Sequence, residues 1–483
     1  MTTESTVGDA LKISELLKAL PSEINEEAAP RDPLADLIVR LSTRAVPVSS
    51  LARMWSLGSM QAKIAMAYLA YAVRGKFMDE TERQKLLNET NLTAALKLLG
   101  TMGYLRGAIM KVGQMLASLP KVLPKEFAEV LGCLHFEAPP MHYAMIREVF
   151  IDELGQEPEE VFASFERQAF AAASLGQVHR ARLKTGEQVA VKIQYPNMQR
   201  MIASDMHNLR TLVAPMRFHK DWAYLMDHIA DAEEMLRQEA DYGREAAFME
   251  RARQVFSDEA RIVAPGCYRN FSSSRVLTMD YLEGIHLQEF MRQNPPPERR
   301  NHFGELISMA MIRLSYHARS YYADPHPGNF LLMADGRLGF LDFGCYRELS
   351  EEEWQMRNDG EKAVIFTHDQ KLLDKVIAYG CLHDSTAEMK KEWVDLVQRT
   401  VAWQGEPALR DEPFDFSDEE WFQRGVDIMV ETGKQRQSRY APAYNWINRS
   451  IIGHRTLMYR LQCRFNFRRV YMENNPNVSA FAR

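Results

Sequence analysis

Apolar residues recur at intervals of three and four along residues 88–118, which predicts an amphipathic helix there. One face would carry Leu98, Met102, Leu105, Ile109, Val112 and Leu116, and the opposite edge would carry Lys111, Gln114 and Ser118. The proline-containing stretches PKVLPKEF and EAPPMHYAM each interrupt the pattern, and a further helix is predicted over residues 145–154. This part of the chain is therefore expected to be an all-α extension.

The hydrophobic pattern changes to a period of two at about residue 166. The runs VHRARL and QVAVKIQ flank the turn sequence KTGE, which predicts an antiparallel hairpin or meander. Helical spacing returns over residues 197–252, and RVLTMDYLEG reads as a short strand followed by a turn. After about residue 300 the pattern is helical, except that FLLM and RLGFLDF flank the turn ADG. The fold class is therefore α+β.

These changes of pattern divide the chain into four segments. Residues 1–45 mix Ser, Thr, Glu and Pro with weak periodicity and read as a mobile leader. The helical extension follows over residues 46–165, a small sheet lobe with inserted helices over 166–285, and a helical lobe with C-terminal helices over 286–483. A chain of 483 residues has room for this number of units.

Composition and charge restrict the class of partner. The net charge of -6 argues against general affinity for nucleic acid. Residues 44–125, however, carry 12 Lys and Arg against four acids, and residues 434–483 carry ten against one. Such basic segments suit a surface of anionic lipid or nucleic acid, or are simply solvated helix faces.

The other bulk features favour a chain made and kept in a reducing cytoplasm. The five cysteines show no C-x-x-C spacing, which supports neither a disulfide framework nor a zinc cluster. The N-terminus has no basic region followed by an apolar core, so it does not read as a secretory signal. The most apolar stretch, IAMAYLAYAV, is shorter than the roughly 20 residues of a spanning helix. Attachment to a membrane surface remains compatible with these features.

The start of the sheet lobe matches a phosphate-binding loop in part. In the template G-x-G-x-x-G-x-V, Ala171 and Ala173 replace the first two glycines of AAASLGQV, Gly176 keeps the third and Val178 keeps the valine. Alanine restricts the backbone and adds a methyl group close to the expected phosphates, so this loop should be stiffer than its glycine counterpart. Ser174 lies at its tip.

Lys192 at the end of VAVK occupies the position of a lysine that holds the α and β phosphates of ATP and pairs with a helix glutamate. The pairing residue should come from LRQEADYGREAAF. If that segment is one helix, Asp241 and Glu245 share a face while Glu239 points elsewhere. We therefore expect Glu245 to be the partner of Lys192, with Glu239 as the second choice.

Asp324 and Asn329 reproduce the D-x-x-x-x-N spacing of a catalytic loop, and Asp342 begins the DFG sequence. In this chemistry the first aspartate orients or deprotonates a hydroxyl, while Asn329 and Asp342 bind metal. His326 would alternatively suit a metal-dependent phosphohydrolase, although two prolines and a glycine around it favour a rigid loop. His317 and Tyr322 are interpreted as packing residues.

The motifs KVGQ, AAASLGQVHRA, VAVKIQYP, EADY, ADPHPGNF and LDFG stand in one order. Over about residues 95–350 this order resembles the UbiB-type (AarF domain-containing) family of atypical kinase-like proteins. The resemblance implies a bilobal protein-kinase-like fold with a helical extension over the active site. It also implies that Lys111 and Gln114 of the extension meet Glu239 and Asp241 in a regulatory contact.

The resemblance further implies ATP or ADP and Mg²⁺ as ligands, with Met279 and Tyr281 contributing to the nucleotide site. Family members support the biosynthesis or distribution of ubiquinone and related isoprenoid lipids, usually at membranes. The chain would then meet a lipid or quinone precursor, at the inner membrane face, as a monomer or a homodimer. It departs from the family where members often have His, at Tyr322, and by lacking C-terminal membrane spans.

Three functions follow from these features. The first is an atypical kinase or ATPase of lipid or quinone metabolism, favoured by the full set of magnesium-binding residues. The second is a phosphotransferase acting on a small molecule or lipid headgroup, because DPHPGN resembles the loop of aminoglycoside and choline kinases. The third is a nucleotide-binding scaffold without catalysis, suggested by the alanine loop and Tyr322.

Overall fold

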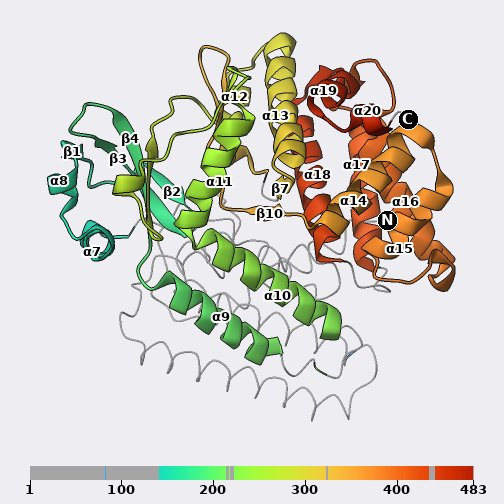
Figure 1. Ribbon diagram of the computed structural model, residues 1–483, viewed down its shortest axis with the longest axis horizontal. Helices are drawn as coiled ribbons and strands as arrows, with labels where there is room; N and C mark the ends of the chain where they lie inside the picture. Colours follow the sequence, from blue (N-terminus) through green and yellow to red (C-terminus); the bar gives the residue numbers. More distant parts are fainter. Residues whose placement is uncertain are drawn as a thin grey trace. The chain divides into compact units, whose positions relative to one another are not determined.

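The computed structural model describes Glu82 and most of the chain from Met141 onwards (Figure 1). The described ranges are residues 141–173, 175–213, 217, 222–322, 325–434 and 441–481. The chain divides into two compact units, and the second unit comprises residues 118–122 and 140–483. The fold described below is that of the second unit. The leader and most of the predicted extension, including Lys111 and Gln114, lie outside the described residues.

An antiparallel sheet forms the first lobe of this unit. Its strand order is β1, β3, β4, β6, with β2 paired to β3 outside this path. The strands are β1 (Ser164–Phe165), β2 (Ala171–Ala173), β3 (Gly176–Arg182), β4 (Gln188–Gln194) and β6 (Val276–Asp280). The hairpin between β3 and β4 is the predicted one, and Gly186 takes a positive φ of 108° in its turn, a conformation that favours glycine.

Burial follows the alternation of the sequence along β3, whereas β4 is buried at every position after Gln188. The central strand β4 lies between β3 and β6 and carries apolar residues on both faces. On one side it contacts the helix α7 (Tyr143–Leu154), which precedes the short helix α8 (Pro158–Val161). The register pairs Val178 with Lys192, so the two predicted nucleotide-binding residues are strand neighbours.

Three helices enter between β4 and β6, as the helical spacing predicted. They are α9 (Met198–Val213), α10 (Trp222–Glu239) and α11 (Tyr242–Val255). In Figure 1 α9 and α10 lie side by side, while α11 continues towards the second lobe. The helix is interrupted between α10 and α11. Asp241 caps the N-terminus of α11, because its side chain accepts hydrogen bonds from Gly243 N and Arg244 N.

The second lobe surrounds the long helix α13 (Pro297–His317), of which 11 residues are buried. Short strands flank the predicted catalytic loop: β7 (Ser320–Tyr322) pairs with β10 (Tyr346–Glu348), and β9 (Leu338–Phe340) pairs with β8 (Phe330–Leu332) and, in parallel, with β5 (Ile262–Val263). The predicted hairpin around ADG is therefore present. The strand pairs β7–β10 and β11–β12 were not expected in this helical region.

Helices make up the rest of the second lobe. They are α12 (Leu287–Arg292), α14 (Glu351–Glu361), which runs into the π-helical turn Lys362–Thr367, α15 (Gln370–Gly380), α16 (Lys391–Gly405), α17 (Glu419–Lys434), α18 (Pro442–Leu461), α19 (Phe467–Asn474) and α20 (Val478–Phe481), with β11 (Phe414–Asp415) and β12 (Arg464–Phe465). Single 3₁₀ turns occur at Arg269–Phe271, Pro327–Asn329, Thr386–Glu388 and Glu406–Ala408. None of the helices in the described part of the chain combines the length and apolar character needed to span a bilayer.

Candidate active site

A buried ion pair joins the sheet lobe to the helix that follows it. The ammonium of Lys192 on β4 donates to both carboxylate oxygens of Glu245 on α11, each at 2.8 Å. Only 8% of the lysine side chain and 1% of the glutamate side chain are exposed. The ring of Tyr242 lies under the ammonium, 4.9 Å from the lysine nitrogen. The pairing of Lys192 with Glu245 was predicted from the sequence, and the structure contains it.

Three acidic residues lie around one glycine of the site. A Cβ on Gly344, the glycine of DFG, would lie 3.2 Å from Asp342 Oδ1, 3.6 Å from Glu245 Oε2 and 3.6 Å from Glu239 Cγ. Asp342 Oδ1 also accepts a 2.8 Å hydrogen bond from Gly344 N, which fixes that carboxylate at the end of the β8–β9 hairpin. The DFG turn therefore brings Asp342 close to the pair of Lys192 and Glu245.

The pKa values of the ion pair reflect its burial and the charges near it. Burial, together with the negative charges of Asp342 and Glu239, raises the pKa of Glu245 to about 7 despite the nearby ammonium. Burial alone would lower the pKa of Lys192, but the charges of Glu245 and Asp342 outweigh it and raise that pKa above its usual value. The lysine is thus held as a cation.

Glu239 lies closer to this group than the sequence predicted. A single helix through residues 239–245 would have pointed Glu239 away from the face of Glu245. The break between α10 and α11 removes that constraint, and Glu239 is 2% exposed and directed at Gly344. Asp241, which was predicted to share a face with Glu245, instead caps α11 through Gly243 N at 3.0 Å and Arg244 N at 3.2 Å. Its carboxylate thereby anchors the first turn that carries Glu245.

Asn329 is held by Tyr322. The amide nitrogen of Asn329 donates to the hydroxyl of Tyr322 at 2.6 Å, so the amide oxygen is turned away from that hydroxyl. The backbone of Asn329 accepts from Leu341 N at 2.9 Å, which places Asn329 beside the residue that precedes Asp342. Asn329 and Asp342 therefore come from adjacent backbone segments.

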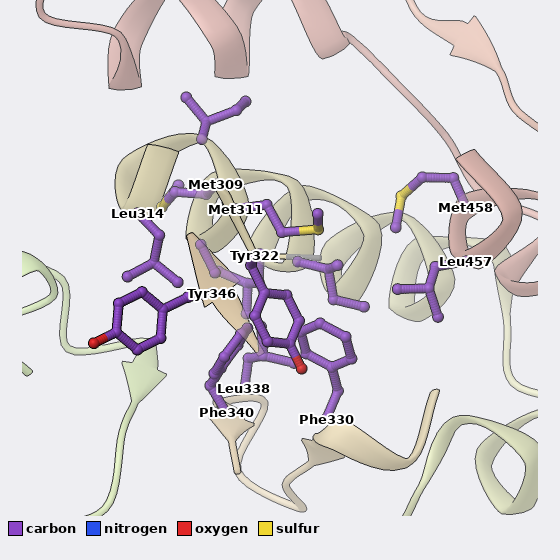
Figure 2. Close-up of a cluster of buried hydrophobic side chains, with 14 of the residues drawn as sticks. Met309, Met311, Leu314, Tyr322, Phe330, Leu338, Phe340, Tyr346, Leu457 and Met458 are labelled. Atoms are coloured by element: carbon purple, nitrogen blue, oxygen red, sulfur yellow. The ribbon is translucent and has the colours of Figure 1, made fainter. Parts of the chain in front are cut away.

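Tyr322 is more than the packing residue that the sequence indicated. Its side chain is 2% exposed, and its ring contacts Phe340 edge to face at 5.0 Å between centroids. Figure 2 shows the ring among Phe330, Phe340 and Leu338, with its hydroxyl directed out of the apolar cluster. No apolar or helical periodicity could have indicated the contact with Asn329, because it depends on how the loop folds back.

The loop between Tyr322 and Asn329 is anchored at both ends, while Asp324 lies outside the described residues. His326 Nδ1 accepts from Gly328 N at 3.1 Å and so caps the short turn, which gives this histidine a structural role in the loop. Pro325 packs on α18 at Gly453, where an added Cβ would overlap the proline ring. A side chain at Gly453 would therefore displace the loop.

The alanine loop is built on the paired strands β2 and β3. Ala171 pairs with Val178 and Ala173 with Gly176, whereas Ser174 is outside the described residues. A Cβ on Gly176 would overlap the carbonyl oxygen of Ile193 and lie 2.8 Å from the Tyr242 hydroxyl, so only glycine fits there. The glycine retained from the template is thus required by close backbone packing.

The last two predicted nucleotide-binding residues lie near the end of β6 and directly after it. Met279 is 7% exposed and pairs with Ala190 on β4, two residues before Lys192 on the same strand. Tyr281 is half-buried, and its hydroxyl accepts from Arg180 at 3.0 Å. The Arg180 guanidinium also lies 4.8 Å from the ring of Phe170 and 5.2 Å from that of Tyr281. Sequence patterns did not indicate this cluster beside the alanine loop.

Asp342 and Asn329 are suited to hold Mg²⁺ together with phosphate oxygens. A carboxylate and an amide provide hard oxygen ligands, and Mg²⁺ in nucleotide sites is usually bound by one or two carboxylates plus phosphates. Among the described residues no group of three or more His, Cys, Asp or Glu side chains is placed to hold a metal by itself.

Replacing Tyr322 with Phe should weaken magnesium binding without unfolding the protein. The variant loses the hydrogen bond that orients the Asn329 amide, at a cost of about 0.5 to 1.5 kcal/mol. We expect the Mg²⁺ concentration for half-maximal nucleotide binding to rise by about twofold to tenfold. A suitable control is Tyr346→Phe on the paired strand, since the Tyr346 ring stacks on Phe248. Equal magnesium requirements for both variants would contradict a positioning role for Tyr322.

The comparison with known families agrees with this geometry. Residues 133–375, about half of the chain, match the family described as the ABC1 atypical kinase-like domain. The chain belongs to this family. The resemblance to UbiB-type, AarF domain-containing proteins that the motifs indicated is therefore confirmed.

Individual relatives support the same conclusion. "Atypical kinase COQ8, mitochondrial" of Schizosaccharomyces pombe is 31% identical over 318 residues, covering 65% of this chain and 51% of that protein. "AarF domain-containing kinase 1" of Drosophila melanogaster is 32% identical over 337 residues, covering 66% and 60%. The matched regions thus span about half to three fifths of these relatives' own length.

Among solved structures, that of Rv3197 from Mycobacterium tuberculosis, in complex with erythromycin, is similar with a TM-score of 0.54 at 26% identity. The likeness covers 83% of this chain and all of that chain. The small antiparallel sheet followed by a helical lobe is therefore a kinase-like fold, as the sequence predicted.

Proposed function

We propose that this protein is an atypical kinase or ATPase that binds Mg-nucleotide and supports the biosynthesis or distribution of ubiquinone or another isoprenoid lipid. The observation that carries the proposal is the convergence of Lys192, Glu245 and Asp342 beside the hairpin that holds Asn329. An ion pair at this position, next to a carboxylate and an amide, is the arrangement that phosphoryl transfer from ATP requires. The family match and the names of the relatives support the kinase class.

Each described residue has a defined task in this proposal. Lys192 holds the α and β phosphates, and Glu245 keeps the ammonium in place because it accepts from it through both oxygens. Asp342 and Asn329 hold the magnesium, which when bound neutralises charge on the phosphate oxygens. Tyr322 fixes the Asn329 amide, and Asp241 fixes the first turn that carries Glu245. Asp324 would orient the attacking oxygen.

The loop DPHPGN also supports a second candidate, phosphate transfer to a small molecule or lipid headgroup. The loop is tied to α18 through Pro325 and capped by His326, so it presents a rigid edge. Transfer of phosphate to a metabolite or lipid would favour this candidate over hydrolysis. Binding of nucleotide without turnover would favour the scaffold.

Phosphate release from Mg-ATP by the purified full chain, with and without liposomes containing cardiolipin, tests the proposal. We expect release that rises with lipid and is lost in Lys192→Arg and Asp342→Asn, because both residues would contact the bound Mg-nucleotide. Stimulation by lipid would indicate that the protein acts at a membrane surface, as the basic segments suggest. If the protein neither binds nor hydrolyses Mg-ATP under either condition, the proposal is wrong.

A further inference from the structure

A cavity lies within the helical lobe, apart from the residues assigned to nucleotide. It has a volume of about 220 Å³, whereas ~10 to 15 Å³ is enough for one water molecule. None of Lys192, Glu245, Asp342 or Asn329 lines it. Most of its wall is apolar and comes from α13, the segment after α14, α16 and α18, through residues such as Met311, Ile312, Val364, Val401, Ile447 and Ile451.

One arginine in this wall has no compensating charge among the described residues. Arg455 on α18 is only 5% exposed, and no described carboxylate forms an ion pair with it. Its guanidinium donates to the backbone oxygen of Gln404 at 2.8 Å and faces the ring of Phe467 at 4.5 Å, but its Nε finds no hydrogen-bond partner in the described part of the chain. An unpaired buried charge is costly, and burial lowers the pKa of Arg455 to about 9.

The neighbours of Arg455 do not supply the missing negative charge. A second nitrogen of the guanidinium contacts His454 Nδ1 at 3.1 Å, and His454 Nε2 contacts Ser308 Oγ at 2.8 Å. Ser308 in turn donates to the carbonyl oxygen of Gly304 at 2.8 Å. Burial and the adjacent guanidinium hold the pKa of His454 well below its usual range, so the imidazole is neutral. This series of hydrogen bonds therefore runs through neutral groups.

The other arginine of the cavity shows how a structural cation is compensated. Arg357 on α14 is 8% exposed, and it pairs with the carboxylate of Glu361 at 2.8 Å while stacking on the ring of Tyr316 at 3.8 Å. Glu361 is bound further by the hydroxyl of Tyr471 at 2.9 Å. The two guanidinium groups line the same cavity, yet only Arg357 has a described acid beside it.

We propose that this cavity is a binding site for a hydrophobic molecule that carries one acidic group. The apolar body would contact the helices, and the carboxylate or phosphate would accept hydrogen bonds from Arg455. A guanidinium binds either anion through two nitrogen atoms, and the low polarity of the surroundings strengthens the interaction. The site is independent of nucleotide, so it is tested in the absence of nucleotide.

The test is calorimetric titration of the full chain with three probes below their critical micelle concentrations: dodecanoate, monododecyl phosphate and dodecan-1-ol. We expect one saturable site that binds one or both anions at least tenfold more tightly than the alcohol. A stronger response to one anion identifies the acidic group that the site prefers. Binding of the alcohol as tightly as the anions, or no saturable binding of any probe, would overturn the proposal.

Arg455→Gln should lower the affinity for the preferred anion at least tenfold and leave the alcohol unchanged. Arg460→Gln is the matched control, because this arginine lies on the same helix but is exposed. Ile451→Trp, which fills the apolar part of the cavity while keeping Arg455, should weaken all three probes. Unchanged anion binding in Arg455→Gln would refute the proposal. If that variant does not fold, unchanged binding of the probes to Ile451→Trp would refute it. The wild-type protein provides a further test, because it must bind the anions more tightly than the alcohol.

Discussion

Replacing Asp342 with Asn is expected to reduce magnesium-dependent phosphate release by about a hundredfold to a thousandfold. A metal ion supplies several kcal/mol of charge stabilisation to a phosphoryl transition state, and ~1.4 kcal/mol corresponds to tenfold in rate. Asp342 is the carboxylate of the described site nearest the glycine of DFG, and the neutral amide removes its negative charge. The measurement is phosphate release over a range of Mg²⁺ concentrations, because weaker metal binding alone would be overcome by more magnesium.

The fold should tolerate this substitution. The side-chain oxygen of the new amide can still accept the hydrogen bond that Asp342 takes from Gly344 N at 2.8 Å, so the turn after the strand is preserved. Asp335→Asn provides a matched control in the turn of the same hairpin, where the exposed aspartate accepts from Arg337 N at 3.0 Å. Full release by Asp342→Asn would remove this residue from the chemistry, while loss in both variants would point to damage to the hairpin.

Sequence patterns predicted the elements that are defined by local hydrophobic periodicity and by turn residues. The hairpin of β3 and β4, the helices between β4 and β6, and the hairpin around ADG all follow from local periodicity and turn residues. The pairing of Lys192 with Glu245 followed because motif order gave both residues a place in one fold. Periodicity did not predict the short strand pairs of the helical lobe, since β11 and β12 are two residues each and depend on tertiary contact.

The contacts of the site that sequence patterns did not predict depend on where helices end and on how loops fold back. Glu239 reaches Gly344 because Asp241 caps a new helix, and a capping aspartate is difficult to distinguish from a helix residue when its neighbours are all helix formers. The hydroxyl of Tyr322 meets Asn329, which lies seven positions later in the sequence, because the loop folds back. The burial of Arg455 was also not predictable from charge alone. Arg455 belongs to a basic segment whose composition indicates a solvated or anion-binding surface, yet its side chain is buried.

Lys192→Met should lower the free energy of unfolding by about 3 to 5 kcal/mol above pH 7, because it leaves a buried carboxylate without its cation. This loss of unfolding free energy should become smaller as the pH falls towards 5. The pKa of Glu245 is raised to about 7 from an unfolded value near 4.5, so its protonated form stabilises the folded protein below pH 4.5 and this stabilisation is lost as the pH rises through 7. Without Lys192 the folded pKa rises further, so the carboxylate is neutral at low pH and needs no partner.

Denaturant unfolding without nucleotide at pH 5.5 and pH 8, followed by tryptophan fluorescence, measures both effects. The double variant Lys192→Met with Glu245→Gln should recover at least half of the loss at pH 8, since a neutral amide does not require the ammonium. Arg399→Met is the control, because Arg399 pairs with Glu431 at 2.9 Å on the surface and such pairs contribute about 1 kcal/mol or less. A loss in Lys192→Met that is equal at the two pH values would mean that the lysine stabilises the fold by packing alone.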